Sequence, residues 1–203
     1  HAALHPQATG LGTTLVIVLL QGARMHWLSI GDSPLYLLRG HRLAQLNETH
    51  SLAPQLDLLV RAGEMSAEEA AAHPSRTCLT SAVGTDPIPQ IDCPDAPVAL
   101  RPGDVVLVAS DGILSLPERR LAQTLRRGWR RSASDLAERL LDGVAAQDAP
   151  EQDNTALALL RAHRGPARRP APRARVGAWS RLATLAGQGR PWPVPAARAG
   201  REP

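Results

Sequence analysis

The first quarter of the chain alternates between short apolar runs and turn residues. The runs cover residues 13–20, 25–30, 35–39 and 42–46 and are dominated by Leu, Val and Ile. Between them stand Gln21-Gly22-Ala23, Gly31-Asp32-Ser33-Pro34 and Gly40-His41, which are residue types typical of tight turns. This pattern predicts four strands joined as an antiparallel meander.

After residue 50 the spacing of the apolar positions lengthens from two residues to about 3.6, the period of a helix. Gly63 then stands where a helix would stop. Ser66 and Glu69 have the spacing of a capping box, which predicts a second short helix that ends before Pro74. We therefore expect a helical insertion over about residues 51–74.

The next section contains a continuous apolar run over residues 105–109, which is typical of a strand buried on both faces. A helix is expected to begin near Pro117, and Ser132 or Ser134 could cap another. A last strand is predicted over residues 155–160. Strands followed by helices, with short connections, favour an α+β fold over alternating βαβ units.

Charge is distributed unevenly along the 203 residues. Residues 163–203 hold nine arginines and one acid, a net charge of +8, whereas the other 162 residues carry a net charge of −4. The body of the protein is acidic, so the sequence does not favour a nucleic-acid-binding fold. The stretch 163–203 is also rich in proline and has little periodicity, and we expect it to be a disordered tail.

Two further features bear on the compartment. Cys78 and Cys93 have no CxxC or histidine spacing around them, so small buried apolar groups are favoured over a disulfide or a metal pair, as in a reducing compartment. The longest apolar run, Leu15–Leu20, is far shorter than the roughly 20 residues that span a bilayer. We expect a cytoplasmic protein with no membrane span.

Three aspartates stand at the ends of apolar strands. Asp32 and Asp111 each follow a predicted strand, and Asp153 precedes the last one. Aspartate is common in turns and caps, which would explain each of them singly. Carboxylates gathered at strand ends are also the oxygen ligands that Mg²⁺ and Mn²⁺ prefer. Composition and spacing alone leave these two interpretations nearly even.

The order of the local motifs decides between the two interpretations. The motifs are Gly12-Thr13-Thr14-Leu15, Gly31-Asp32-Ser33-Pro34-Leu35-Tyr36, Thr49-His50-Ser51, Arg76-Thr77-Cys78-Leu79-Thr80 leading to Val83-Gly84, Pro102-Gly103-Asp104 with Ser110-Asp111-Gly112-Ile113, and Asp153-Asn154-Thr155. Six motifs in this order and approximate spacing resemble the metal-dependent protein phosphatases, the PPM or type 2C serine/threonine phosphatase family. The resemblance covers residues from about 12 to 161, within a predicted domain over residues 1–162.

The resemblance implies a four-layer α-β-β-α sandwich of two antiparallel sheets flanked by helices. It also implies hydrolysis of phosphoserine and phosphothreonine in proteins, with two or more Mn²⁺ or Mg²⁺ ions and with a serine/threonine kinase as a natural counterpart. Asp111 and Asp153 match ligands of the catalytic metal in this family, and Asp32 matches the ligand of an additional, weaker metal site. The insertion at about 51–74 resembles the flap beside the substrate entrance.

The sequence also departs from the family pattern. Thr49 stands where the family usually has Asp, and Thr77 stands where Asn is common. The family's first strands, with an acidic ligand and an Asp-Gly loop, have no counterpart in residues 1–11, so the chain resembles the C-terminal two-thirds of the domain. The alternative is a non-catalytic phosphatase-like binding module or an inactive fragment.

Overall fold

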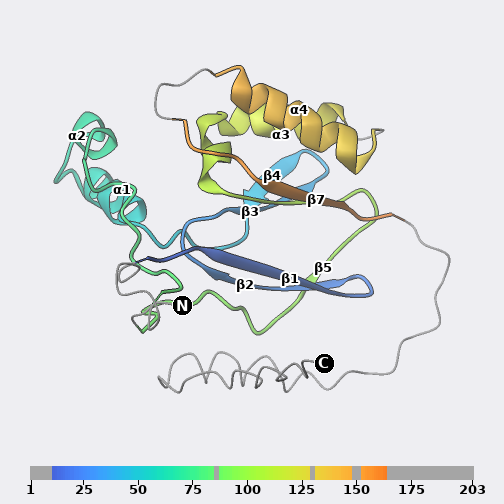
Figure 1. Ribbon diagram of the computed structural model, residues 1–203, viewed down its shortest axis with the longest axis horizontal. Coiled ribbons are helices and arrows are strands. Elements are labelled where there is room, and N and C mark those ends of the chain that lie inside the picture. Colours follow the sequence, from blue (N-terminus) through green and yellow to red (C-terminus); the bar gives the residue numbers. More distant parts are fainter. Residues whose placement is uncertain (1–10, 85–86, 129–130, 148–151, 164–203) are drawn as a thin grey trace, which may run out of the picture.

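The computed structural model describes residues 11–84, 87–128, 131–147 and 152–163. These residues form two antiparallel sheets and a set of helices (Figure 1). The elements are β1 (Leu15–Gln21), β2 (Arg24–Ile30), β3 (Leu35–Arg39), β4 (Arg42–Gln45), α1 (Ala53–Ala62), α2 (Ala67–Ala71), β5 (Val98–Ala99), β6 (Val105–Ala109), the 3₁₀ helix η2 (Asp111–Ser115), α3 (Glu118–Arg127), α4 (Ala133–Ala145) and β7 (Leu157–Arg161). The expected α+β class with two antiparallel sheets and flanking helices is confirmed.

The first four strands are divided between the two sheets. One sheet has the order β1-β2-β5 and the other has the order β4-β3-β6-β7. The predicted tight turns between β1 and β2 and between β3 and β4 are confirmed, with Gly22 and Gly40 at positive φ of 63° and 59°. The continuous meander is wrong, because β2 and β3 do not pair. The four-residue segment from Gly31 to Pro34 carries the chain from one sheet to the other instead of closing a hairpin.

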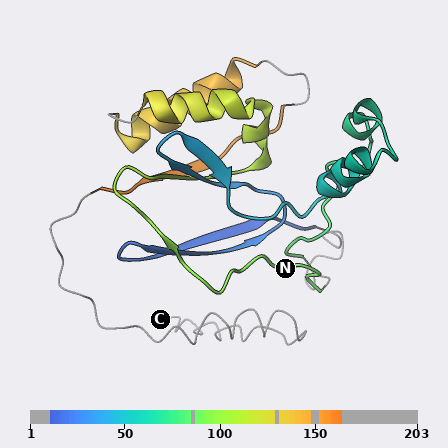
Figure 2. The same ribbon diagram turned by 180° about the vertical axis from the view of Figure 1, so that it is seen from behind.

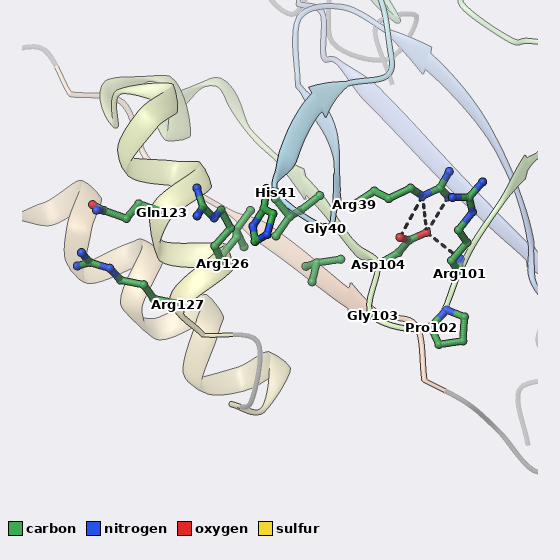
Figure 3. A pocket seen from close by; sticks show the side chains of 13 residues that line it. Arg39, Gly40, His41, Arg101, Pro102, Gly103, Asp104, Gln123, Arg126 and Arg127 are labelled. Atoms are coloured by element: carbon green, nitrogen blue, oxygen red, sulfur yellow. Dashed lines mark hydrogen bonds and ion pairs between the residues drawn. The ribbon is translucent and has the colours of Figure 1, made fainter.

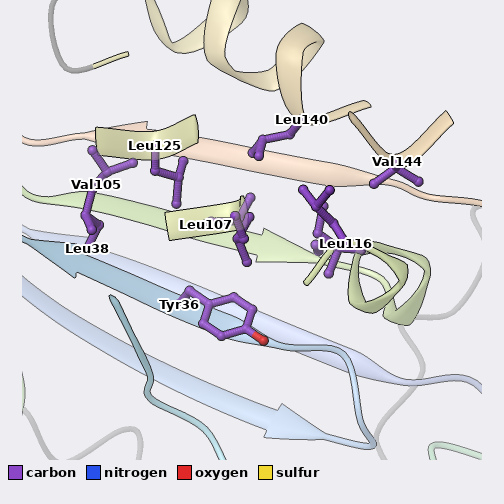
Figure 4. Close-up of a cluster of buried hydrophobic side chains, with 11 residues drawn as sticks. Tyr36, Leu38, Val105, Leu107, Leu116, Leu125, Leu140 and Val144 are labelled. Atoms are coloured by element: carbon purple, nitrogen blue, oxygen red, sulfur yellow. The ribbon is translucent and has the colours of Figure 1, made fainter. Parts of the chain in front are cut away.

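Strand β6 lies at the centre of the hydrophobic core. Val105, Leu107 and Ala109 pack toward α3 and α4, whereas Val106 packs between the two sheets. Figure 4 shows the helix-side cluster, in which Leu107 lies below Leu125 and Leu140. Because both faces of this strand are covered, the prediction of a strand buried on both sides is confirmed.

The helices begin where their sequences predict. Ser66 and Ser132 both form complete capping boxes, with Glu69 and Asp135 as the reciprocal partners. Pro117 is the cap residue directly before α3. Helices α3 and α4 cover the outer face of the four-stranded sheet, and the α1–α2 pair extends from one end of the sandwich (Figures 1 and 2).

The outer face of the three-stranded sheet is apolar. Leu15 and Ile17 of β1 lie on the face opposite the one that packs Val16 and Val18 into the core, and they remain 38% and 39% exposed. In the part of the chain that the structure describes, no helix covers this face (Figure 2). The expected fourth layer is therefore not among the described residues.

Three expectations concern other parts of the chain. The predicted tail lies outside the described residues except for His163. Among the described helices, none is both long and apolar enough to cross a bilayer. Cys78 is exposed and Cys93 is partly buried, so the expectation that both are buried is wrong; both lie in irregular segments outside the core strands.

Candidate metal centre

The first aspartate, Asp32, lies in the segment that links the two sheets. Gly31 before it has a φ of +99°, a conformation that residues with a side chain rarely adopt. A Cβ atom at Gly31 would also collide with the side chain of Thr14, the residue directly before β1. The hydroxyls of Thr14 and Ser33 are 2.7 Å apart and share a hydrogen bond. Glycine is therefore required for the tight approach that places Asp32.

Two buried polar side chains, Asn47 and His50, fix this segment through hydrogen bonds to its backbone. Asn47 is 6% exposed, and its Oδ1 accepts a 2.7 Å hydrogen bond from the N–H of Leu35 while its Nδ2 donates to the carbonyl of Ser33 at 3.0 Å. His50 accepts a hydrogen bond from the N–H of Gly31. The sequence gives no sign of this role of Asn47, because an Asn directly after a predicted strand is typical of an exposed turn.

The second aspartate, Asp111, follows β6 and opens η2. The carbonyl of Pro34 accepts a 3.1 Å hydrogen bond from the N–H of Ala109, so the two aspartate segments are linked through the backbone. Burial raises the pKa of Asp32, and the negative charge of Asp111 raises it further, against a smaller effect of a backbone hydrogen bond. The structure thus brings these two carboxylates, which are 79 residues apart in sequence, into electrostatic contact.

Ser110 joins the segment of Asp111 to that of Asp153. Its hydroxyl donates to the carbonyl of Asn154 at 3.1 Å and accepts from the N–H of Ala156 at 3.0 Å. A Cβ atom at Gly112 would lie only 2.8 Å from the carbonyl oxygens of Asp153 and Asn154. The Ser-Asp-Gly and Asp-Asn-Thr segments are therefore packed together at backbone distance, which requires the serine and the glycine.

The third aspartate lies on the surface of this arrangement. Asp153 is exposed, and its Oδ1 accepts a 2.7 Å hydrogen bond from the N–H of Asn154. This local bond is the turn role that aspartate commonly plays. It leaves the second carboxylate oxygen available to solvent or to a ligand.

The donor chemistry of the three aspartates suits a hard divalent cation, since such ions take carboxylate oxygens and water. Across the described ranges, however, no group of three or more His, Cys, Asp and Glu side chains is gathered in a way that could hold a metal ion. The described residues therefore fit part of a metal centre. Asp32 and Asp111, whose charges repel each other, and a third aspartate on an adjoining segment are present.

Comparisons with known proteins show which proteins this chain resembles. No family model matches the chain. The serine/threonine phosphatase Stp of Listeria monocytogenes is 36% identical over 118 residues, which is 58% of this chain and 45% of that protein. The protein phosphatase PhpP of Streptococcus pneumoniae is 36% identical over 107 residues, or 53% of this chain and 42% of that protein. The chain thus spans about half the length of the curated relatives that it matches.

Solved structures extend the similarity to most of the chain. The serine/threonine phosphatase PstP/Ppp of Mycobacterium tuberculosis superposes with a TM-score of 0.64 at 27% identity, covering 80% of this chain and 65% of that one. A structure of the PstP catalytic domain in complex with two manganese ions has a TM-score of 0.58 at 27% identity, covering 78% of this chain and 62% of that one. In sequence and in fold, this chain is related to the serine/threonine phosphatases of the metal-dependent PPM, or type 2C, family.

Proposed function

We propose that this chain forms part of a metal-dependent phosphoprotein phosphatase that hydrolyses phosphoserine and phosphothreonine. The observation that carries the proposal is the joining of Asp32, Asp111 and the Asp153 segment at one end of the two sheets. Burial and the charge of Asp111 both raise the pKa of Asp32, and repulsion between two carboxylates is unfavourable unless a cation or a proton compensates it.

In this proposal Asp111 and Asp153 hold the catalytic cation, and Asp32 contributes to an additional cation site. Bound Mn²⁺ or Mg²⁺ supplies an activated water for attack on phosphorus. Manganese is the ion named for PstP, which supports manganese here. The remaining ligands of a two-metal centre would come from outside the three aspartates.

The other residues of the site position the backbone that carries the three aspartates. Ser110 and Gly112 hold the segments of Asp111 and Asp153 in register, and His50 and Asn47 hold the Asp32 segment. Such support matters because ligands must be held to within about 0.5 Å of their working positions.

The α1–α2 pair is proposed to act as the substrate-facing flap. Its chain departs directly after His50 and Ser51, and Ser51 bridges to Leu79 on the returning chain. An ion pair of 2.9 Å between Arg76 and Asp57 ties the returning chain to α1. This position beside the Asp32 segment suits a role in substrate choice.

The substrates are proposed to be phosphorylated proteins, with a cognate serine/threonine kinase as the counterpart enzyme and the cytoplasm as the location. Both cysteines are free thiols, which supports a reducing compartment.

Calorimetric titration with Mn²⁺ tests the metal assignment without needing turnover. We expect Asp111→Asn and Asp153→Asn to weaken Mn²⁺ binding by at least tenfold and Asp32→Asn to have a milder effect. Asp142→Asn, which changes an exposed aspartate on α4, is the matched control and should bind as the wild type does.

Hydrolysis of a phosphothreonine peptide with Mn²⁺ tests the activity. If Asp111→Asn bound Mn²⁺ normally, the metal assignment would be wrong. Metal binding without any hydrolysis, even with the family's upstream strands fused to this chain, would instead support a non-catalytic phosphatase-like module.

A further inference from the structure

A cavity of about 610 Å³ lies at the end of the sandwich opposite the aspartates. It is formed by the β3–β4 turn, the turn before β6 and the C-terminal half of α3. Strand β6 runs from Asp104 in this cavity to the segment of Asp111, and at about 3.3 Å per residue that is roughly 20 Å. The cavity is therefore a separate place from the candidate metal centre.

The walls of the cavity combine an apolar floor with a basic rim. Leu38, Val105 and Leu125 form the floor and are buried. The polar side chains around it are Arg39, His41, Arg101, Gln123, Arg126 and Arg127. In Figure 3, His41, Arg126 and Arg127 lie on one side, and Arg39 and Arg101 flank Asp104 on the other.

Among the described residues, Asp104 is the only acid that lines this cavity, and its charge is already paired with an arginine. Its Oδ2 accepts 2.7 Å hydrogen bonds from Nη2 of Arg39 and from the backbone N–H of Arg101. Arg126 and Arg127 form no ion pair with any described residue. The four arginines and one carboxylate among the described lining residues give a net charge of about +3, before any contribution from His41.

Helix stability explains only part of this arrangement. Arginines in the last turn of α3 interact favourably with the helix dipole, which accounts for Arg126 and Arg127 on their own. It does not account for Arg101 and His41, which come from two other turns and line the same hollow. Basic residues from three separate segments line one space, and such a lining suits an anion.

We propose that this cavity binds a small anion that carries two or more phosphate groups. Guanidinium groups form paired, charge-assisted hydrogen bonds with phosphate oxygens. Positive groups on two opposite walls suit an anion with more than one charged group. The volume lies within the range of about 300–1,000 Å³ that is typical of small-molecule sites.

Calorimetric titration with pyrophosphate tests the proposal at constant ionic strength in EDTA, so that no cation at the aspartates can hold the probe. We expect Arg126→Gln to raise the dissociation constant about tenfold, and Gln123→Glu, which adds a negative charge at an exposed helix position, to raise it at least as much. Arg120→Gln removes an exposed arginine on the same helix outside the cavity and should change it less than twofold.

The arginines of residues 164–203 are the same in every variant, so any binding there adds an equal background. In an amide NMR titration, the largest pyrophosphate shifts should fall on Gly40 and Gly103, which line the cavity. No saturable binding, equal losses for Arg126→Gln and Arg120→Gln, or shifts confined to residues elsewhere would overturn the proposal.

Discussion

His50 accepts a 3.1 Å hydrogen bond at Nδ1 from the backbone N–H of Gly31, the residue directly before Asp32. The N–H of His50 in turn donates to the carbonyl of Gly31 at 3.1 Å, so the two residues are joined twice. His50 is 1% exposed, and its Nε2 has no partner among the described residues. An imidazole that accepts at Nδ1 carries its proton on Nε2, so the neutral tautomer is set by Gly31.

Replacing His50 with alanine should lower the free energy of unfolding by about 1–3 kcal/mol, because the buried N–H of Gly31 loses its acceptor. Urea denaturation measures this loss. His50→Asn is the matched variant, since its amide oxygen can take the place of Nδ1 and should recover part of the stability. If Asn were no better than Ala, the hydrogen bond would not be the source of the effect.

Asn47→Asp should destabilise the fold by about 2–3 kcal/mol at neutral pH, because a buried carboxylate would face the carbonyl of Ser33 with no proton to donate. At low pH the protonated acid can donate again. The loss in free energy of unfolding relative to the wild type should therefore shrink as the pH falls. Asn47→Ala has no such proton, and its deficit should not depend on pH. Identical pH profiles for the two variants would contradict this role of Asn47.

Gly112→Ala should lower the stability by about 1–3 kcal/mol, because the new Cβ must push apart the two aspartate segments. It should also weaken Mn²⁺ binding. Gly143→Ala, at a position inside α4, is the control. Its Cβ would make only an ordinary 3.6 Å contact with Leu116, and Ala is favoured over Gly inside a helix by about 1 kcal/mol. Thermal unfolding should therefore show opposite shifts, and a stabilising Gly112→Ala would refute the packing argument.

Asp104 links the stability to pH through Arg39. Burial tends to raise the pKa of Asp104, but the hydrogen bonds from Arg39 and Arg101 and the charges of these arginines outweigh burial and hold it below its usual value. The folded state therefore binds this proton more weakly than the unfolded state. The resulting stability is fully present above the unfolded-state pKa of about 3.9 and is lost as the pH falls through the lower folded-state pKa.

Asp104→Asn should accordingly cost about 2–3 kcal/mol at pH 7, since hydrogen bonds to a charged group are removed. The difference in free energy of unfolding between this variant and the wild type should become smaller below about pH 4. Urea unfolding over a pH series measures this change, with Asp142→Asn as an exposed control that should follow the wild type. A deficit that stayed constant down to pH 2 would show that packing, and not charge, is responsible.

Local patterns in the sequence were sufficient to predict most of the elements. The capping boxes at Ser66 and Ser132, the helix stop at Gly63 and the buried strand β6 are all found as expected. Each of these depends on residues within a few positions of one another, where periodicity and backbone preference act directly. The motif order also indicated the family, which the comparisons bear out. The metal assignment of the three aspartates stays a prediction.

Tertiary structure alone decided which segments meet. No pattern in the sequence shows that β2 and β3 belong to different sheets, that Asn47 is buried beneath Ser33, or that Asp32 approaches Asp111. The same holds for the basic cavity, whose arginines come from the end of β3, the turn before β6 and the end of α3. These relationships arise from packing between segments, and hydrophobic periodicity encodes only which face of an element is buried and not which partner covers it.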